Sequence, residues 1–126
     1  MRVVGGRLKG RNLASPSSND IRPTADRLRE SVFNILIHAY DNPIADARVL
    51  DLFAGTGALG IEAVSRGAKF TLFVDNGAEA RALLRNNVEA LGLRIRSSRS
   101  RWCFSIRLTP KISPTRRWPR CAMAAG

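Results

Sequence analysis

Apolar and polar positions recur along this chain with two periods, and each period predicts a different kind of element. Five apolar side chains follow helical spacing: Leu28, Val32, Ile35, Leu36 and Ala39. This spacing predicts a helix with one apolar face, opened by residues 22–24 and ended by residues 41–43. Upstream, residues 2–14 place a glycine-rich segment between two short stretches that contain apolar residues, which predicts a β-hairpin.

The next part of the chain alternates between apolar runs and helical spacing. It predicts four elements in order: a strand at 48–53, a helix at 58–66, a strand at 69–75 and a helix at 76–90. Gly67 and Gly92 end the two helices, and Asn76 can cap the second. Strand, helix, strand and helix with short links predict a right-handed parallel βαβ unit, so the fold class is α/β. A sheet of only two parallel strands is too small to cover helix layers on both of its faces. We therefore expect much apolar surface to stay exposed.

A glycine-rich turn joins the first of these strands to its helix. Gly55, Gly57 and Gly60 fit the pattern GxGxxG, which lets backbone N–H groups approach a ligand at a helix N-terminus. Asp75 closes the second strand, 20 residues after Gly55, where a carboxylate can accept hydrogen bonds from ribose hydroxyls. The pattern predicts a site for a nucleoside-containing cofactor.

Asp51, four residues before Gly55, helps to distinguish between the cofactors that such a turn can bind. A dinucleotide site usually keeps its strand apolar up to the first glycine, because a pyrophosphate gains nothing from a neighbouring anion. A carboxylate suits a cationic ligand, and S-adenosylmethionine carries a sulfonium and an ammonium group. The residues therefore favour S-adenosylmethionine. NAD is one alternative, and tight strand–helix packing by the glycines, with Asp51 and Asp75 as solvated loop acids, is the other.

The net charge of +11 is unevenly distributed along the 126 residues. Residues 1–93 contain 12 Lys and Arg against 10 Asp and Glu, whereas residues 94–126 contain nine Lys and Arg and no acid. Beyond residue 94 neither helical nor strand periodicity is evident. Cationic side chains also gather in the arm: Arg7, Lys9, Arg11, Arg22, Arg27 and Arg29. They could contact phosphates, or simply form a solvated face with Arg–Glu pairs.

Three motifs occur together in an order and spacing that resemble one known family. They are residues 4–11 (VGGRLKGR), 22–30 (RPTADRLRE) and 50–63 (LDLFAGTGALGIEA). The chain resembles the bacterial small-subunit (16S) ribosomal RNA guanine-N2 methyltransferases over nearly all of residues 1–93. The resemblance implies the amino-terminal part of a Rossmann-like class I methyltransferase fold, with an N-terminal hairpin and helix and an incomplete sheet. It implies methyl transfer from S-adenosylmethionine to N2 of a guanine.

The same resemblance assigns roles to residues. The S-adenosylmethionine site would contain nine of them: Asp51, Phe53, Gly55, Thr56, Gly57, Asp75, Asn76, Arg22 and Thr24. Contacts with ribosomal RNA or a preribosomal particle would come from four: Arg7, Lys9, Arg11 and Arg27.

The family's catalytic Asn/Asp-Pro-Pro-Tyr/Phe motif does not occur in this chain, so we assign no catalytic residue and expect the chain to be inactive. Residues 100–109 can, however, be encoded by a nucleotide sequence that reads Ser-Leu-Val-Phe-Leu-Asp-Pro-Pro-Tyr in a shifted frame. Our hypothesis is a frameshift after about residue 93, with lost material at the junction. A functionless tail of other origin and a real RNA-binding arm with stacking by Trp102 and Trp118 are the alternatives.

These inferences divide the chain into three parts. Residues 1–44 form a hairpin and helix arm, residues 45–93 a partial S-adenosylmethionine-binding unit, and residues 94–126 a basic, frameshifted and disordered tail. A catalytically dead RNA- or nucleotide-binding fragment is the alternative function. The sequence shows no membrane span or signal peptide, and Cys103 and Cys121 suggest neither a disulfide nor a metal site, so we expect a cytoplasmic protein without metal.

Overall fold

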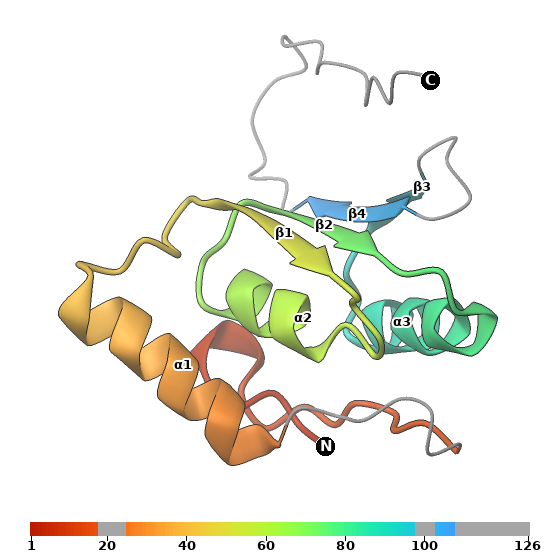
Figure 1. The fold of residues 1–126 in the computed structure, drawn as a ribbon, viewed down its shortest axis with the longest axis horizontal. Coiled ribbons are helices and arrows are strands. Elements are labelled where there is room, and N and C mark those ends of the chain that lie inside the picture. Colours follow the sequence, from red (N-terminus) through yellow and green to blue (C-terminus); the bar gives the residue numbers. More distant parts are fainter. Residues whose placement is uncertain (18–24, 98–102, 108–126) are drawn as a thin grey trace, which may run out of the picture.

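The computed structural model describes residues 1–17, 25–97 and 103–107. Its elements follow the chain in the order η1 (Gly6–Leu8), α1 (Asp26–Ala39), β1 (Arg48–Leu52), α2 (Ala58–Ser65), β2 (Phe70–Val74), α3 (Ala78–Ala90), β3 (Ile95–Ser97) and β4 (Cys103–Arg107). The strands form one sheet in the order β1-β2-β4-β3. The helices lie on one side of it, with α1 on the side of β1 (Figure 1). The α/β class and the incomplete sheet are confirmed.

The predicted βαβ unit is present with nearly the expected bounds. β1 and β2 pair in parallel, with Leu50 opposite Leu72, and α2 connects them. Gly67 and Gly92 follow the two helices with positive φ values of 109° and 67°, so they end them as expected. Asn76 as the cap of α3 is wrong. The N-cap is Gly77, and the side chain that binds near the helix start is that of Asp75, which accepts a hydrogen bond from Gly77 N.

The segments 95–97 and 103–107 are strands, although the sequence predicted no regular structure after residue 94. β4 runs antiparallel to both β2 and β3. Its alternation turns Phe104 and Ile106 into the core, where they belong to the same cluster as the buried apolar side chains of α2 and α3. The expectation of a fully disordered tail is therefore wrong for these two segments. Residues 98–102 and 108–126 of the tail, with Trp102, Trp118 and Cys121 among them, lie outside the described part.

The amino-terminal segment folds back on itself more loosely than a regular hairpin. A single antiparallel bridge joins Arg2 and Asn12, and the connection contains the 3-10 turn η1. Val3, Leu8 and Leu13 from this segment lie in the same core cluster as the apolar side chains of α2 and α3. The boundary drawn at residue 44 between the arm and the cofactor unit stays a prediction.

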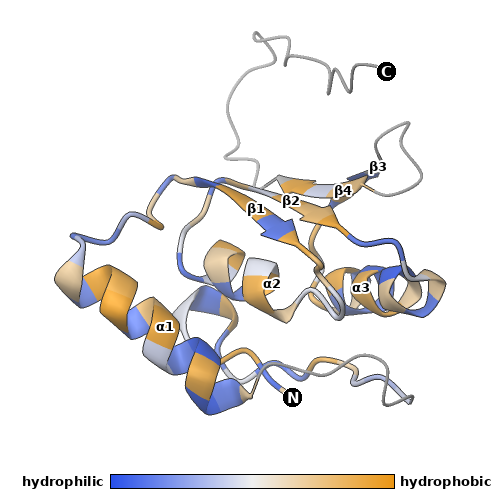
Figure 2. Ribbon diagram, viewed as in Figure 1, coloured by the Kyte–Doolittle hydropathy of each residue, from blue (hydrophilic) through white to orange (hydrophobic). Residues whose placement is uncertain are grey.

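The predicted helix is present as α1, but its apolar face is not the face that is buried. Leu28 and Ile35 are more than half exposed and Val32 is also exposed, whereas Arg29 and Phe33 are the buried residues. Phe33 packs on Ala63 of α2, and of the predicted face only Leu36 packs against this cluster. The rest of the apolar stripe has no described element over it (Figure 2). The uncovered face of the sheet likewise exposes Leu50 and Leu52, which confirms the expected exposure of apolar surface.

Candidate cofactor-binding site

The glycine-rich turn lies at the carboxyl end of β1, where the chain enters α2. Phe53, Gly55 and Gly57 have positive φ values of 61°, 57° and 80°, a backbone region that glycine adopts without steric cost but phenylalanine does not. Two main-chain hydrogen bonds fix the turn: Ala54 donates to Val74 O at 3.0 Å, and Gly57 donates to Ala54 O at 2.8 Å. The turn is thus tied to the end of β2 as well as to β1.

Two of the three glycines are required for packing. A Cβ at Gly60 would lie 2.3 Å from Cε1 of Phe73 and 2.7 Å from Cγ2 of Thr71. A Cβ at Gly57 would lie 2.2 Å from Cδ1 of Leu84. Close strand–helix packing therefore accounts for Gly57 and Gly60, while Gly55 is half-buried at the turn itself.

Asp51 is held beneath the turn and is only 8% exposed. Its Oδ2 accepts a hydrogen bond from Gly60 N at 3.0 Å, and no donor among the described residues reaches its other oxygen. Burial raises the pKa of Asp51 to about 6; the charge of Asp75 acts in the same direction, and the bond from Gly60 opposes both. Asp51 is not a solvated loop acid. It is a largely buried carboxylate with one oxygen bound by Gly60 N, and a cationic ligand would compensate its charge.

Asp75 clamps the turn from the end of β2. Its Oδ2 accepts from Gly55 N at 2.8 Å and its Oδ1 from Gly77 N at 2.7 Å. One carboxylate thereby joins the glycine turn to the start of α3. Each oxygen can accept a second hydrogen bond, so the geometry is compatible with ribose hydroxyls as additional donors.

The other residues predicted for the cofactor site differ in how far they are exposed to solvent. Phe53 is 91% exposed at the mouth of the turn. Thr56 is buried, with its hydroxyl 4.0 Å from the sulfur of Met1, so it packs against the amino-terminal segment. Asn76 is exposed beside Asp75. Arg22 and Thr24 lie outside the described residues.

Buried polar side chains that join the amino-terminal segment to the helices were missed by the sequence reasoning. Asn87 of α3 accepts from Ala14 N at 2.6 Å and donates to Thr56 O at 3.0 Å. Glu62 accepts from Val4 N at 2.9 Å, and Ser65 from Leu8 N at 2.9 Å. Polar residues within the otherwise apolar helix α2 were the available signal. These contacts hold the segment against the layer that carries the turn.

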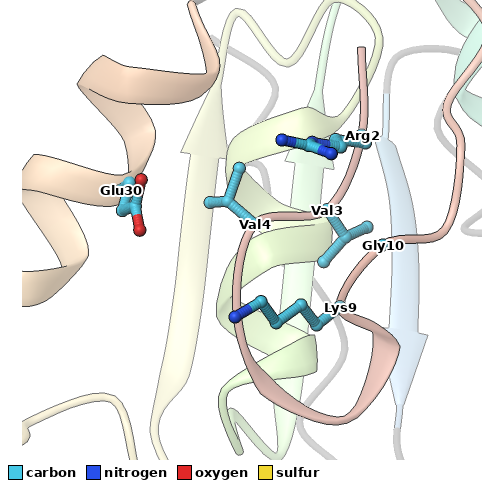
Figure 3. A pocket seen from close by; sticks show the side chains of 6 residues that line it. All are labelled: Arg2, Val3, Val4, Lys9, Gly10 and Glu30. Carbon is cyan, nitrogen blue, oxygen red and sulfur yellow. The ribbon is translucent and has the colours of Figure 1, made fainter.

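The predicted RNA contacts, Arg7, Lys9, Arg11 and Arg27, are all exposed. Arg11 also donates to Ala90 O at 2.9 Å, at the carboxyl end of α3. Lys9 lines a hollow of about 240 Å³ with Arg2 and Glu30, and both cationic side chains extend toward the side of α1 (Figure 3).

The residues that the structure describes contain no group of three His, Cys, Asp or Glu side chains that could hold a metal ion. In the same ranges, no helix has the length and apolar character needed to cross a membrane.

Comparison with known proteins places this geometry in a family. The chain is 43% identical over 93 residues to the "Putative rRNA methyltransferase YlbH" of Bacillus subtilis, covering 74% of this chain and 48% of that protein. It is 46% identical over 87 residues to the ribosomal RNA small subunit methyltransferase D of Escherichia coli, covering 68% and 42%. The chain thus spans about half the length of these relatives.

A solved structure gives the same result. "Putative methyltransferase yhhF from Escherichia coli" is 39% identical, with a TM-score of 0.62 over 73% of this chain and 47% of that one. The sequence model of the family described as Conserved hypothetical protein 95 matches residues 1–106, which extends past the change in composition near Leu93. The chain therefore belongs to this family, with relatives named as methyltransferases of small-subunit ribosomal RNA.

Proposed function

We propose that this chain binds S-adenosylmethionine at the turn between β1 and α2. The observation that carries the proposal is the pair of carboxylates, Asp51 and Asp75, which hold Gly60 and Gly55 at either end of the turn. A buried carboxylate with one free oxygen suits a cation, and S-adenosylmethionine supplies two. When bound, this cofactor provides an electrophilic methyl group.

The chain's own residues would bind and orient the cofactor. Asp51 faces its positive charge, and Asp75 accepts hydrogen bonds from the ribose hydroxyls. Gly55 and Gly57 allow close approach of the backbone, and Phe53 offers an exposed ring at the mouth of the turn. Thr56, Asn76, Arg22 and Thr24 complete the proposed site, with Thr56 acting through its packing.

The proposed substrate is the N2 amine of a guanine in small-subunit ribosomal RNA, free or in a preribosomal particle. The names of the relatives support ribosomal RNA. Arg7, Lys9, Arg11 and Arg27 are exposed and would contact its phosphates. Such a substrate places the protein in the cytoplasm.

We propose that the 126 residues alone bind the cofactor without transferring its methyl group. The sequence contains six prolines and no two are adjacent, so it lacks the family's Asn/Asp-Pro-Pro-Tyr/Phe motif. A group that receives the target amine is therefore missing from this chain. The second candidate is a catalytically dead module that binds RNA or a nucleotide, favoured by the exposed cations of the arm.

Calorimetry with three ligands separates these functions. We expect the chain to bind S-adenosylhomocysteine, and Asp75→Ala to weaken that binding at least tenfold, while Glu89→Gln on the exposed side of α3 does not. Binding of NAD in preference to S-adenosylhomocysteine would favour a dinucleotide site. Binding of a ribosomal RNA fragment alone would favour the dead module, and methylation of that RNA by the chain would refute the proposed inactivity.

A further inference from the structure

The carbonyl of Thr56 lies in the glycine turn and does not have the partner that a regular helix would give it. In an α-helix it would accept a hydrogen bond from the N–H four residues later, which here belongs to Gly60. Gly60 N donates instead to Oδ2 of Asp51 at 3.0 Å. The next bond along the chain, from Ile61 N to Gly57 O at 2.9 Å, is the first of α2. The contact that Asp51 makes therefore leaves a turn carbonyl that another donor must satisfy.

Asn87 of α3 supplies that donor. Asn87 is 2% exposed, and its Nδ2 donates to Thr56 O at 3.0 Å. The same amide is bonded to both main-chain groups of Ala14: Oδ1 accepts from Ala14 N at 2.6 Å, and Nδ2 donates to Ala14 O at 3.4 Å. An asparagine can make all three bonds because its side chain offers two donors and an acceptor. One buried amide thus joins the turn, α3 and the end of the amino-terminal segment.

The amino-terminal segment, residues 1–14, also reaches the turn from its other end. Met1 packs against the main core cluster, and its sulfur lies 4.0 Å from the hydroxyl oxygen of Thr56. Leu13 N donates to Met1 O at 2.9 Å, which keeps the two ends of the segment side by side. Both ends therefore meet at Thr56, one through a side-chain contact and the other through Asn87.

The same segment carries cationic side chains that are exposed and that we propose as RNA contacts. One of them, Arg11, donates to Ala90 O at 2.9 Å, about one turn after Asn87 on α3. Residues 11–14 are therefore attached to α3 at two neighbouring points. Any displacement of these residues would act on Asn87 and, through its amide, on Thr56 O.

We propose that Asn87 is a positioning residue for the cofactor turn and couples that turn to the amino-terminal segment. It acts through the peptide between Thr56 and Gly57 rather than on the ligand itself, and the segment holds the Asn87 amide in its orientation. The coupling is reciprocal, so a ligand that fixes the turn also stabilises the bond from Ala14 N to Asn87. The inference rests on the proposed function, since it concerns the same turn and the same ligand.

Asn87→Asp separates the two halves of this contact. The variant keeps an oxygen that accepts from Ala14 N but loses the N–H that donates to Thr56 O. Calorimetry should show an affinity for S-adenosylhomocysteine about tenfold lower than that of the unmodified chain, because a buried carbonyl of the turn is left without its donor. Asn86→Asp makes the same substitution at the neighbouring exposed position of α3 and should leave the affinity unchanged.

Hydrogen exchange in the unmodified chain gives an independent readout. Adding S-adenosylhomocysteine should slow exchange at Ala14 N by a larger factor than at Gly10 N, which donates to Val3 O within the segment. A merely structural role for Asn87 predicts no such difference, since general stabilisation by a ligand slows both amides alike. In Asn87→Asp the additional slowing at Ala14 N should disappear.

The outcomes are distinguishable from one another. Circular dichroism establishes which variants are folded under the conditions of the assay. Equal affinity of folded Asn87→Asp and Asn86→Asp, or equal slowing at Ala14 N and Gly10 N, would overturn the inference while leaving the proposed function intact. If Asn87→Asp does not fold, the exchange measurement on the unmodified chain decides alone. Absence of S-adenosylhomocysteine binding by the unmodified chain would refute the proposed function, and this inference with it.

Discussion

Asp51 should make the chain less stable at neutral pH than it would be with a neutral side chain in its place. The carboxylate is buried under the glycine turn, and only one of its oxygens accepts a hydrogen bond from a described residue. Asp51→Asn keeps an oxygen that can accept from Gly60 N and removes the charge. The substitution therefore measures the free-energy cost of ionising the buried side chain while the hydrogen bond from Gly60 N is kept.

The magnitude follows from the pKa of Asp51, which burial raises from 3.8 to about 6. The folded chain binds this proton more tightly than the unfolded chain, so stability falls as the pH rises from about 4 to about 6 and the cost is fully present above that. At about 1.4 kcal/mol per pH unit, ionisation costs about 3 kcal/mol. Asp51→Asn should thus raise the free energy of unfolding at pH 7.5 by up to that amount.

Urea unfolding followed by circular dichroism at pH 4 and pH 7.5 measures this directly. We expect the two proteins to be similar at pH 4 and Asp51→Asn to be the more stable at pH 7.5, while its affinity for S-adenosylmethionine falls. Glu89→Gln, which removes a charge from an exposed position, is the control. If Asp51→Asn destabilises the chain at pH 7.5, or keeps the pH dependence of the original chain, the reasoning about the buried carboxylate is wrong.

Three further predictions concern the same region. Binding of S-adenosylmethionine should tighten as the pH rises from 5 to 7, by at most about tenfold per unit, since a cation favours ionised Asp51; affinity that is constant over this range in calorimetry would contradict it. Gly60→Ala should lower the free energy of unfolding by about 1–3 kcal/mol, because its Cβ would overlap Phe73; urea unfolding with an unchanged midpoint would contradict it. Asn87→Ala should cost about 2 kcal/mol and speed hydrogen exchange at Ala14 N, which loses its acceptor; unchanged exchange there would refute the structural role of Asn87.

The sequence predicted the elements around the turn well because local signals define them. Gly67 and Gly92 mark helix ends through their positive φ, and the apolar runs before Asp51 and Asp75 mark strands. The positions of both carboxylates next to the turn followed from the parallel pairing of those strands. What spacing could not show is that Gly57 and Gly60 are needed for packing, which depends on the side chains of α3 and β2.

The errors arose where the answer depends on distant parts of the chain. The apolar stripe of α1 has correct helical spacing, but which part of a helix is buried depends on the elements available to cover it. Phe104 and Ile106 of β4 alternate correctly with polar residues, but the surrounding basic composition obscured so short a strand. Asn87 bonds to Ala14, 73 residues away, and no local pattern reveals such a pairing.

The frameshift after about residue 93 stays a prediction. The family match and the strand β4 both extend beyond that point, so a shift, if it occurred, need not begin where the composition changes. The genomic DNA across codons 90–110 tests it. A sequence unable to encode Asp-Pro-Pro-Tyr in the shifted frame would exclude the hypothesis.

The most direct test of the account is to observe the glycine turn while S-adenosylhomocysteine is added. The chain contains ten glycines, so selective ¹⁵N-glycine labelling gives a simple amide spectrum in which Gly55, Gly57 and Gly60 can be assigned by substitution. We predict that saturating ligand shifts the Gly55 signal most, because Gly55 N is held by Asp75 at the proposed ribose position, and leaves Gly10 and Gly92 unchanged. Binding that leaves Gly55 unperturbed, or no binding at millimolar ligand, would contradict the assignment of this turn as the cofactor site.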